Sequence, residues 1–536
     1  MKTLQIPFLI LCSLVIFNSS FGCYVSHLSK DSAKNKELLW KKFKLMKKIS
    51  FDEIDSCDIS DDCRYVALGY EDKNVCIYDL DNKSNIVYKY SSDSAFEELK
   101  FYPCGDYFLS GHLNGTVILH DIRNQDTILS YKHEHNALFL LFSHDYRYII
   151  SGHANESIVI HDAKTDKRFF EMRHVHDADD GYEEAMEKLL VSENDAYLAS
   201  FCECGLLRLL DMKNKKELHV SLGGVASDVV FTSDSTEIVV ASEGRAVIID
   251  LKKLFALATR RDVNLDDDLY EPCRWHFITE GVLNDVRLSK DGRFLIAGGL
   301  MEKVCFYDLK TRKPVLELSL VEPGEEGQFA YFINSLHFSE DENTVIIAGA
   351  KINETLSGKG FVKIGILQKD ENGIVNGCKM ETIYISDEPY NLCFSEHKRY
   401  LGVMSSDLNV FDLKKKECLL TVPVSLGRAF AKFSPDSDKF ILLDLKNLSC
   451  YKTPSCIYFN EKKRQLAPKK NKVFREVLSE RKTKKQFVDC SIKYSAGKKL
   501  EGKKGFVGSK RKRKTGRKEK KEEGRLYPFK RAKVKR

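Results

Sequence analysis

A short phrase that recurs nine times is the feature that most constrains the fold of this chain. In each copy a hydrophobic residue is followed closely by Ser, Thr or Pro and by polar turn residues, and an apolar run comes after the turn. The copies begin at residues 59, 101, 142, 191, 231, 288, 338, 394 and 433. Recurrence at intervals of 39 to 57 residues predicts an array of similar structural units.

A second motif lies in most of the same units, at the end of a run rich in β-forming residues. It is an aspartate preceded by an aromatic, histidine or aliphatic residue, and the seven aspartates are Asp79, Asp121, Asp162, Asp211, Asp250, Asp308 and Asp412. Between the two motifs lies a run with small residues, such as Leu109-Ser110-Gly111, followed by a polar turn. Because Val, Ile, Phe and Tyr dominate, each unit is predicted to contain four short strands joined by turns.

Together the two motifs resemble the repeats of the WD-repeat family, whose blades carry a hydrophobic-Ser-Pro-Asp-Gly phrase before the second strand and Trp-Asp at the end of the third. The resemblance covers roughly residues 45 to 455, although Trp is replaced throughout and the family's Gly-His dipeptide is missing. It implies an all-β fold, a divergent WD-repeat β-propeller. It also implies that the seven aspartates are structural residues of the blades and that the propeller binds protein partners.

The number of blades is less constrained than the fold, because nine phrases exceed the usual four to eight blades. We expect eight blades, with seven as the alternative. The run from Leu38 to Leu45 is expected to supply a closing outer strand to the last blade. The predicted organisation is a signal-peptide-like segment at 1–22, a leader at 23–50, the propeller at 51–456 and a basic tail at 457–536.

The net charge of +7 conceals two opposed parts. Residues 461–536 contain 31 basic and 8 acidic residues, a net +23, whereas the first 460 residues contain 54 basic and 70 acidic residues, a net −16. This density of like charge predicts a largely disordered tail with nuclear-import or RNA-binding function. The candidate residues are Lys462, Lys463, Arg464, Lys510, Arg511, Lys512, Arg513, Lys514, Lys530, Arg531, Lys533, Lys535 and Arg536.

The first 22 residues indicate a different compartment. Lys2 precedes an apolar run from Leu4 to Phe17, and Ser20-Phe21-Gly22 offers small residues for cleavage, as in a secretory signal peptide. The run is too short for a membrane span, which needs roughly 20 apolar residues. The alternative is a translation start placed too early, with Met46 as the true start.

No sequence motif indicates catalysis, a cofactor or a metal. Gly-x-Ser-x-Gly, Walker and dinucleotide-binding motifs do not occur. His120 and His161 each precede an aspartate, but they stand where the family has Trp, so packing is expected rather than general-base chemistry. The His and Asp residues between 174 and 180 and the run Asp266-Asp267-Asp268 lack the ligand spacing of metal sites and are expected to be charged loops.

The 16 cysteines are scattered singly through apolar runs, which predicts reduced, buried thiols. Cys202 and Cys204 form the one close pair, and they lack the second pair or histidine of a zinc site. We therefore expect no enzyme activity, no cofactor and no small-molecule substrate.

Two classes of function remain. In the first, the chain is a non-catalytic scaffold in a nuclear or nucleolar assembly, with protein partners on the propeller faces and RNA or an import receptor on the tail. This architecture is similar to that of WD-repeat ribosome-biogenesis factors. In the second, the chain is a secreted or exported propeller that uses its N-terminal signal and acts, through its tail, in the nucleus of another cell.

Overall fold

Four-stranded antiparallel sheets recur along the chain, and each contains one copy of the repeated phrase. The computed structural model describes residues 43–453, apart from 52–53, 83–85, 104, 174–185, 203–204, 223–225, 326–328, 340–341, 354–357, 372, 386, 396–398, 416 and 425–428. These residues belong to the first of two compact units, 1–481. The signal-like segment, most of the leader and the basic tail lie outside the described residues.

The first four blades are separate sheets whose strands pair in chain order. Within each blade the phrase forms the turn after the first strand, and the aspartate motif ends the third. The strands are β2 (Ile54–Ile59), β3 (Tyr65–Tyr70), β4 (Asn74–Asp79) and β5 (Ile86–Ser91); β6 (Phe96–Phe101), β7 (Tyr107–His112), β8 (Thr116–Asp121) and β9 (Asp126–Lys132); β10 (Ala137–Phe142), β11 (Tyr148–His153), β12 (Ile158–Asp162) and β13 (Lys167–Met172); β14 (Met186–Val191), β15 (Tyr197–Cys202), β16 (Leu206–Asp211) and β17 (Lys216–Ser221).

The next three blades are joined into one ten-stranded sheet, because β21 is shared by blades 5 and 6 and Leu300 of β22 pairs with Phe332 of β25 between blades 6 and 7. The Leu251 amide donates to the Thr236 carbonyl at 3.1 Å, so the ends of β19 meet and this element is a hairpin that turns at Gly244. β21 is the outer strand of blade 5 over 274–278 and the inner strand of blade 6 over 282–288. The strands are β18 (Ala226–Phe231), β19 (Glu237–Asp250), β21 (Arg274–Leu288), β22 (Phe294–Leu300), β23 (Lys303–Asp308), β24 (Lys313–Ser319), β25 (Ala330–Phe338), β26 (Thr344–Ile352), β27 (Gly358–Lys369) and β28 (Val375–Ile385).

The last blade takes its outer strand from the N-terminal side of the chain. Blade 8 consists of β29 (Asn391–Phe394), β30 (Tyr400–Met404), β31 (Asp407–Asp412) and β32 (Glu417–Pro423), and blade 9 begins with β33 (Phe430–Phe433), β34 (Lys439–Asp444) and β35 (Asn447–Lys452). β1 (Lys44–Ser50) then pairs antiparallel with β35, from Lys44 opposite Lys452 to Ser50 opposite Asn447. This pairing closes the ring without leaving an incomplete last blade.

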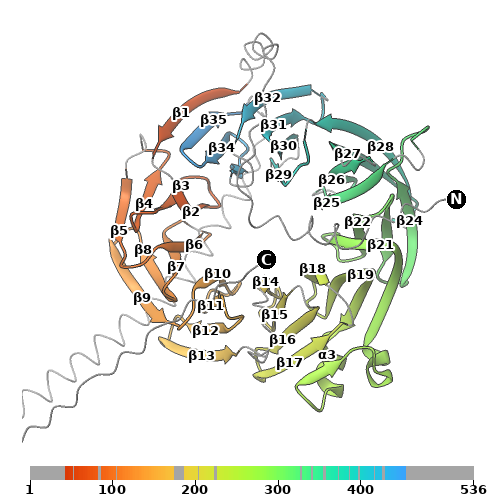
Figure 1. Ribbon diagram of the computed structural model, residues 1–536, viewed down its shortest axis with the longest axis horizontal. Coiled ribbons are helices and arrows are strands. Elements are labelled where there is room, and N and C mark those ends of the chain that lie inside the picture. Colours follow the sequence, from red (N-terminus) through yellow and green to blue (C-terminus); the bar gives the residue numbers. More distant parts are fainter. Residues whose placement is uncertain are drawn as a thin grey trace, which may run out of the picture. The chain divides into compact units, whose positions relative to one another are not determined.

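The described residues therefore form nine blades, and our expectation of eight was one too low. Every phrase lies in its own blade of four antiparallel strand segments, including the last, because β1 completes it. The expected fold class, a β-propeller of WD-repeat type, is confirmed. Figure 1 shows the blades arranged around a central axis, with the inner strands β2, β6, β10 and β14 nearest to it.

The core of the propeller lies between neighbouring blades. Tyr65, Val75 and Ile77 of blade 1, for example, share a buried apolar cluster with Leu99 and Phe108 of blade 2. Each sheet thus buries both faces only because a blade stands on either side of it, and each fully buried side chain of this kind stabilises the fold by about 1.5–3 kcal/mol.

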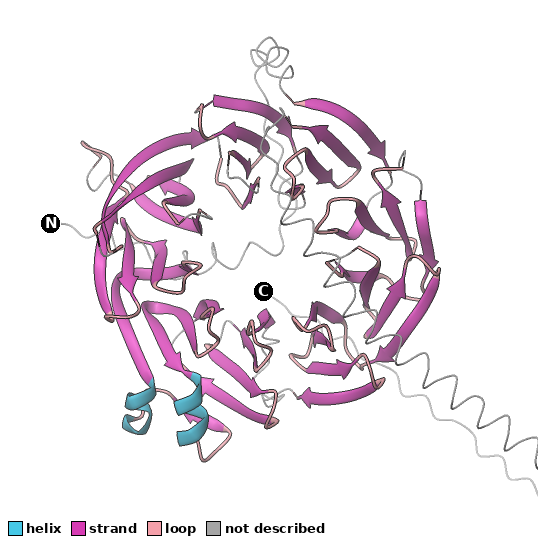
Figure 2. Ribbon diagram, turned by 180° about the vertical axis from the view of Figure 1, so that it is seen from behind, coloured by secondary structure: helices cyan, strands magenta, loops and turns pink. Residues whose placement is uncertain are grey.

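One insertion adds helices to the rim of the ring. Between the third and fourth strands of blade 5 the chain forms α3 (Leu251–Leu257), β20 (Asp262–Asn264) and a short 3-10 helix, η3 (Asp268–Cys273). Figure 2 shows the helices together at one edge of a molecule otherwise built of strands. β20 pairs in parallel with β17, so it extends blade 4 to a fifth strand and ties blade 5 to blade 4.

Candidate binding surfaces of the propeller

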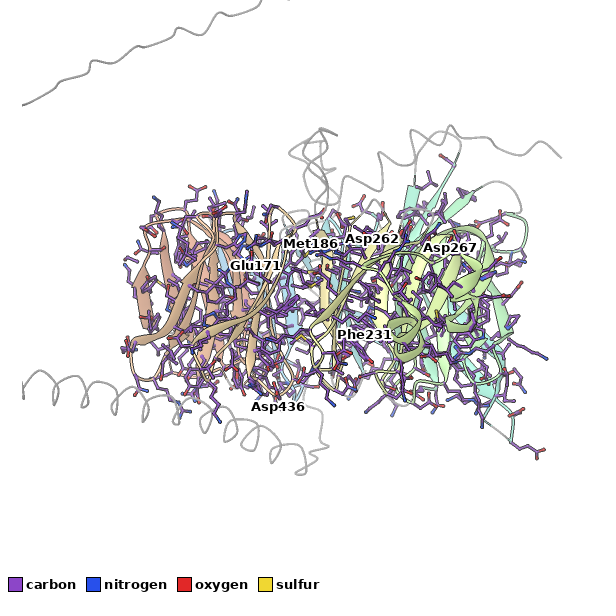
Figure 3. The ribbon with its side chains drawn as sticks, turned by 90° about the horizontal axis from the view of Figure 1, so that it is seen from below. Glu171, Met186, Phe231, Asp262, Asp267 and Asp436 are labelled. Atoms are coloured by element: carbon purple, nitrogen blue, oxygen red, sulfur yellow. The ribbon has the colours of Figure 1, made fainter. Side chains whose placement is uncertain are left out.

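The blades present two faces, distinguished by the turns that they carry. Because all blades share one strand order, the turns after first strands and after third strands lie on the same face, which we call the signature face. We call the turns after first strands inner turns and those after third strands outer turns. Figure 3 shows Asp436, in the inner turn of blade 9, on this face and Met186, at the start of β14, toward the opposite one.

The seven predicted aspartates all lie at the ends of third strands, where they accept hydrogen bonds from the amides of the outer turns. Asp308 is fully buried and accepts from the Lys310 and Thr311 amides at 2.8 and 3.0 Å. Asp250 caps α3 by accepting from the Lys253 amide at 2.9 Å. Equivalent bonds are made by Asp79, Asp121, Asp162, Asp211 and Asp412.

Four of these aspartates also pair with an arginine at the start of the second strand. The pairs are Arg64–Asp79 at 2.9 Å, Arg147–Asp162 at 3.0 Å, Arg293–Asp308 at 3.2 Å and Arg399–Asp412 at 3.1 Å. Blade 2 uses the reverse arrangement, with Arg123 of the outer turn paired to Asp106 at 2.6 Å. The aspartates therefore fix turn geometry and do not present free carboxylates to a partner.

Each inner turn is held by the hydroxyl of the repeated phrase. In blade 1 the Tyr65 amide donates to Ser60 Oγ at 2.9 Å, and Ser60 Oγ donates to Asp62 at 2.6 Å. The same amide-to-hydroxyl bond joins residues five apart in seven further blades, at 2.8–3.0 Å. The exception is blade 2, where Tyr102 occupies the hydroxyl position.

The position at which the family phrase has glycine is left-handed in these turns, but it usually carries a side chain. The backbone φ is between 53° and 61° at Cys63, Tyr146, Asp195, Ser235, Glu342 and Ser437. Non-glycine residues adopt such φ values only at a cost of about 1–2 kcal/mol.

These side chains reach back to the inner turn of the preceding blade. Asp195 of blade 4 accepts from the His144 and Asp145 amides of blade 3 at 2.7 and 2.8 Å. Glu342 of blade 7 accepts from the Asp291 amide of blade 6 at 2.9 Å. Ser235 Oγ accepts from the Asn194 amide, and the Cys63 thiol donates to the Phe433 carbonyl. The ring of Tyr146 packs against the ring of Tyr102. The inner turns of five pairs of neighbouring blades are thus linked, which holds these blades in a fixed relation.

Charged side chains on the inner strands link blades a second time. Asp58 of β2 accepts from the Phe101 amide of β6 at 2.7 Å, and Asp285 of β21 accepts from the Leu336 amide of β25 at 2.6 Å. Asp228 joins three strands, since it pairs with Lys188 at 2.5 Å and with Arg287 at 2.8 Å. Sequence analysis missed this set, which no linear motif marks.

Burial perturbs the titration of several of these carboxyl groups. It raises the pKa of Glu98, on β6, to about 7. Burial also raises the pKa of Asp285, and the adjacent carboxylate of Asp228 adds to that shift. Carboxyl groups with such pKa values can keep a proton near neutral pH, so the inner strands need fewer compensating cations than their composition suggests.

Histidines in blades 2 and 3 form buried hydrogen-bonded chains. Ser110 Oγ lies 2.9 Å from His112 Nε2 and 2.8 Å from His120 Nε2, and the Tyr88 hydroxyl lies 3.0 Å from His120 Nδ1. Blade 3 repeats the Ser–His pair between Ser151 and His153 at 2.9 Å. The sequence signal that reveals these pairs is Ser-Gly-His at the end of both second strands.

These histidines are structural groups of the blades. Burial lowers the pKa of His120 to about 3 and that of His153 to about 4, so both rings are neutral. The His120 ring stacks on Phe108 at 4.3 Å, and the His161 ring stacks on Tyr131 at 4.6 Å. His161 Nε2 also lies 3.2 Å from Asp166 Oδ1, in the outer turn of the same blade.

The predicted charged loops fall partly within the described structure. Asp266 pairs with Arg245 at 3.3 Å and with Arg274 at 3.2 Å, so it anchors the blade 5 insertion. The loop between 174 and 180 lies outside the described residues, as do the candidate tail residues from Lys462 to Arg536. Within the described ranges, no group of three or more His, Cys, Asp or Glu side chains is placed to hold a metal ion.

Nine described cysteines are free thiols, but Cys202 is disulfide-bonded, contrary to the expectation of reduced thiols throughout. Cys204 lies outside the described residues.

Among the helices that the structure describes, none has the length and apolar character needed to cross a membrane.

Comparison with known proteins gives one distant relative in sequence and remote similarity to solved propeller domains. No protein-family model matches the chain. Over 185 residues the chain is 28% identical to the probable U3 small nucleolar RNA-associated protein 18 of Schizosaccharomyces pombe; the match covers 33% of this chain and 31% of that protein. The chain thus spans about a third of the length of this curated relative.

Among solved structures, the C-terminal WD40 domain of Sif2 is 13% identical, with a TM-score of 0.45 over 77% of this chain and 99% of that domain. The β-propeller domain of Myceliophteria thermophila Cps50 (Swd1) is also 13% identical, with a TM-score of 0.39 over 59% of this chain and 97% of that domain.

Proposed function

We propose that this chain is a non-catalytic scaffold that mediates protein–protein interactions in a nuclear or nucleolar assembly engaged in ribosome biogenesis. The observation that carries the proposal is the bonding between neighbouring blades, through inner turns, as between blades 3 and 4, and through inner strands, as between blades 1 and 2. A ring held in this way presents the loops of its two faces in fixed positions. Scaffolds need that property, because ordering flexible loops on binding costs affinity.

Two further features support the nucleolar part of the proposal. The relative with detectable similarity is described as U3 small nucleolar RNA-associated. The net charge of +23 over residues 461–536 suits phosphate binding or nuclear import, and the acidic remainder of the chain suits basic protein partners. The tail residues from Lys462 to Arg536 are therefore proposed to contact RNA or an import receptor.

The proposal is tested by locating the full chain in cells and identifying what it carries. Fused to a fluorescent protein, the full chain is expected in nucleoli, and affinity purification is expected to enrich ribosomal-RNA precursors and assembly proteins. A chain in which Lys510, Arg511, Lys512, Arg513 and Lys514 are changed to Gln should lose nuclear accumulation. The matched control changes Lys44, Lys89, Lys132, Lys369 and Lys414 to Gln and should remain nucleolar.

The pattern of residues 1–22 favours a second candidate, a secreted or exported propeller. N-terminal sequencing of the natural protein separates the two. A mature end at Cys23 supports the secretory route and contradicts the scaffold in its own nucleus, whereas an end upstream of Leu4 supports the first proposal. A start at Met46, the alternative considered from the sequence, would remove the buried Phe43 and the first pairings of β1 with β35.

A further inference from the structure

The outer turns of four consecutive blades carry an excess of basic residues. In blades 3 to 6 the segments 162–168, 211–216, 250–253 and 308–313 contain eleven Lys or Arg and five Asp. Four of these five aspartates are Asp162, Asp211, Asp250 and Asp308, whose carboxylates bond inward to turn amides. Positive charge therefore dominates what these turns present, although the first 460 residues are acidic overall.

Contacts between neighbouring blades join the four turns into one surface, which we call the basic arc. Lys215 of blade 4 donates to the Phe169 carbonyl of blade 3 at 3.0 Å and lies over the Phe169 ring. Lys216 donates to the Phe255 and Ala258 carbonyls of the blade 5 insertion at 2.6 and 2.7 Å. In Figure 1, β13, β17 and α3 follow one another along the rim in this order.

The arc continues from blade 5 to blade 6 through Trp275. Lys253 of α3 and Arg312 of the blade 6 outer turn both lie over its ring, at 5.2 and 4.4 Å from the centroid. Arg312 also pairs with Glu237, so its charge is compensated. These residues are the framework of the arc, since their cations are engaged within the protein.

Five other lysines of the basic arc are exposed and available. Lys167, Lys213, Lys252, Lys310 and Lys313 are all exposed, and their ammonium groups make no hydrogen bond or ion pair with the described residues. None of the large exposed hydrophobic residues among the described residues lies in these four turns. A protein interface normally contains buried aromatic or apolar anchors, whereas a phosphate backbone requires only accessible cations along its path.

We propose that the basic arc binds the phosphate backbone of single-stranded RNA. A single strand can bend to follow the curved rim, whereas a duplex is stiff over this length. The inference extends the proposed scaffold function by giving the propeller its own RNA contact, and it does not depend on the basic tail.

The test uses the full chain and fluorescein-labelled polyuridine, with affinity measured by anisotropy at several salt concentrations. The arc variant changes Lys167, Lys213, Lys310 and Lys313 to Gln. For single-stranded nucleic acid, the slope of log affinity against log salt concentration becomes shallower by about 0.7 for each phosphate contact that is removed. The slope should therefore become shallower by about 3, and affinity at low salt should fall at least about tenfold, even though the tail is intact.

The matched control removes the same charge from other blades by changing Lys89, Lys132, Lys369 and Lys414, all exposed, to Gln. It should keep the native slope, and both variants should melt at the native temperature because every changed side chain is at the surface. Photo-crosslinking of the native chain to 4-thiouridine-substituted RNA should label peptides that contain Lys213 or Lys310.

Two results would overturn the proposal. Equal losses in the arc and control variants would show that only net charge matters. Competition by polyglutamate as strong as that by unlabelled polyuridine would assign the arc to an acidic protein instead. Failure of the scaffold proposal would appear separately, as absence of the full chain from nucleolar complexes, and would leave this comparison of purified proteins unaffected.

Discussion

At the scale of single residues, the inner turns hold non-glycine residues in a strained left-handed conformation, and the side chains of these residues contact the neighbouring blade. Asp195 has a φ of 56°, and its carboxylate accepts two amides from blade 3. Glycine would relieve the left-handed strain but would remove both hydrogen bonds. Each hydrogen bond to a charged group contributes roughly 1.5–3 kcal/mol, so the bonds outweigh the strain.

Asp195→Gly is therefore expected to lower the free energy of unfolding by about 1–3 kcal/mol, measured by urea denaturation. The matched control is Lys73→Gly, which has a φ of 65° and an exposed side chain. That change should be neutral or slightly stabilising. If the two substitutions had the same effect, the contact between inner turns would contribute nothing to stability.

The protonated carboxyl group of Glu98 gives a prediction about pH. Burial raises its pKa to about 7, whereas an unfolded glutamate titrates near 4.3. Between these values the native state holds a proton that the unfolded state has released, so this residue's contribution to stability falls as pH rises from 5 to 7. Glu98→Gln imitates the protonated form at every pH.

As the pH rises through this range, the unfolding free energy of the native chain should therefore fall, relative to that of the Glu98→Gln chain, by up to about 1.4 kcal/mol for each pH unit. Urea denaturation at pH 5, 6, 7 and 8 measures it. Comparing two chains cancels the opposite effect of neutral histidines such as His120 and His153, which both chains share. A difference that is constant with pH would mean that Glu98 is ionised throughout.

At the scale of elements, β1 is the strand that completes the ring. Phe43, just before it, is 1% exposed and packs edge-on against Tyr400 and Phe440 of blades 8 and 9, at 5.8 and 6.2 Å between ring centroids. Leu45, two residues on, is 42% exposed. The attachment of this strand therefore depends on Phe43 and on the backbone ladder with β35.

Phe43→Ala is expected to destabilise the propeller by about 3–5 kcal/mol, because it removes a buried aromatic ring and leaves a cavity. Leu45→Ala should change stability by no more than about 0.5 kcal/mol. Hydrogen exchange should rise first in β35 and β34 of the Phe43→Ala chain. Equal protection of all nine blades in that variant would argue against β1 as the closing element.

Element by element, the sequence was informative wherever one residue type performs the same local task in most blades. Ser60 and Asp79 are examples, since a hydroxyl that closes an inner turn and a carboxylate that caps an outer turn recur at fixed positions. β20 could not be predicted, because its three residues have no period and its pairing with β17 depends on distant parts of the chain. The bonds that Asp228 and Asp285 make between blades could not be predicted either, because they too depend on distant parts of the chain.

At the scale of the whole molecule, the blade count depended on a contact between segments far apart in sequence. Nine phrases favoured nine units, but blade 9 has only three strands of its own, and its fourth comes from residues 44–50. β21, which belongs to both blade 5 and blade 6, further obscures the boundary between those two blades. Phrase number was therefore a better guide than the usual range of propeller sizes.

The nine-bladed ring predicts that the chain can be reordered without changing its structure. Lys44 pairs with Lys452, so residues 43–51 can be moved to follow Thr453 through a short turn, with the new chain beginning at Ile54. In this permutant β1 follows β35 as an ordinary outer strand, and all nine blades are continuous in sequence. The seam between blades 9 and 1 is still closed by Lys432, which pairs with Asp61 at 2.9 Å.

The permutant is expected to unfold cooperatively within about 5 °C of the unpermuted segment 43–453, as measured by circular dichroism. The permutation replaces one covalent connection with another and keeps every strand pairing. The entropy cost of closing a connection grows only slowly with its length. A matched chain that carries a Gly-Ser stretch of equal length in place of residues 43–51 should melt at a clearly lower temperature. If the permutant melted like that chain, β1 would require its link to β2, and the ring would not consist of nine equivalent blades.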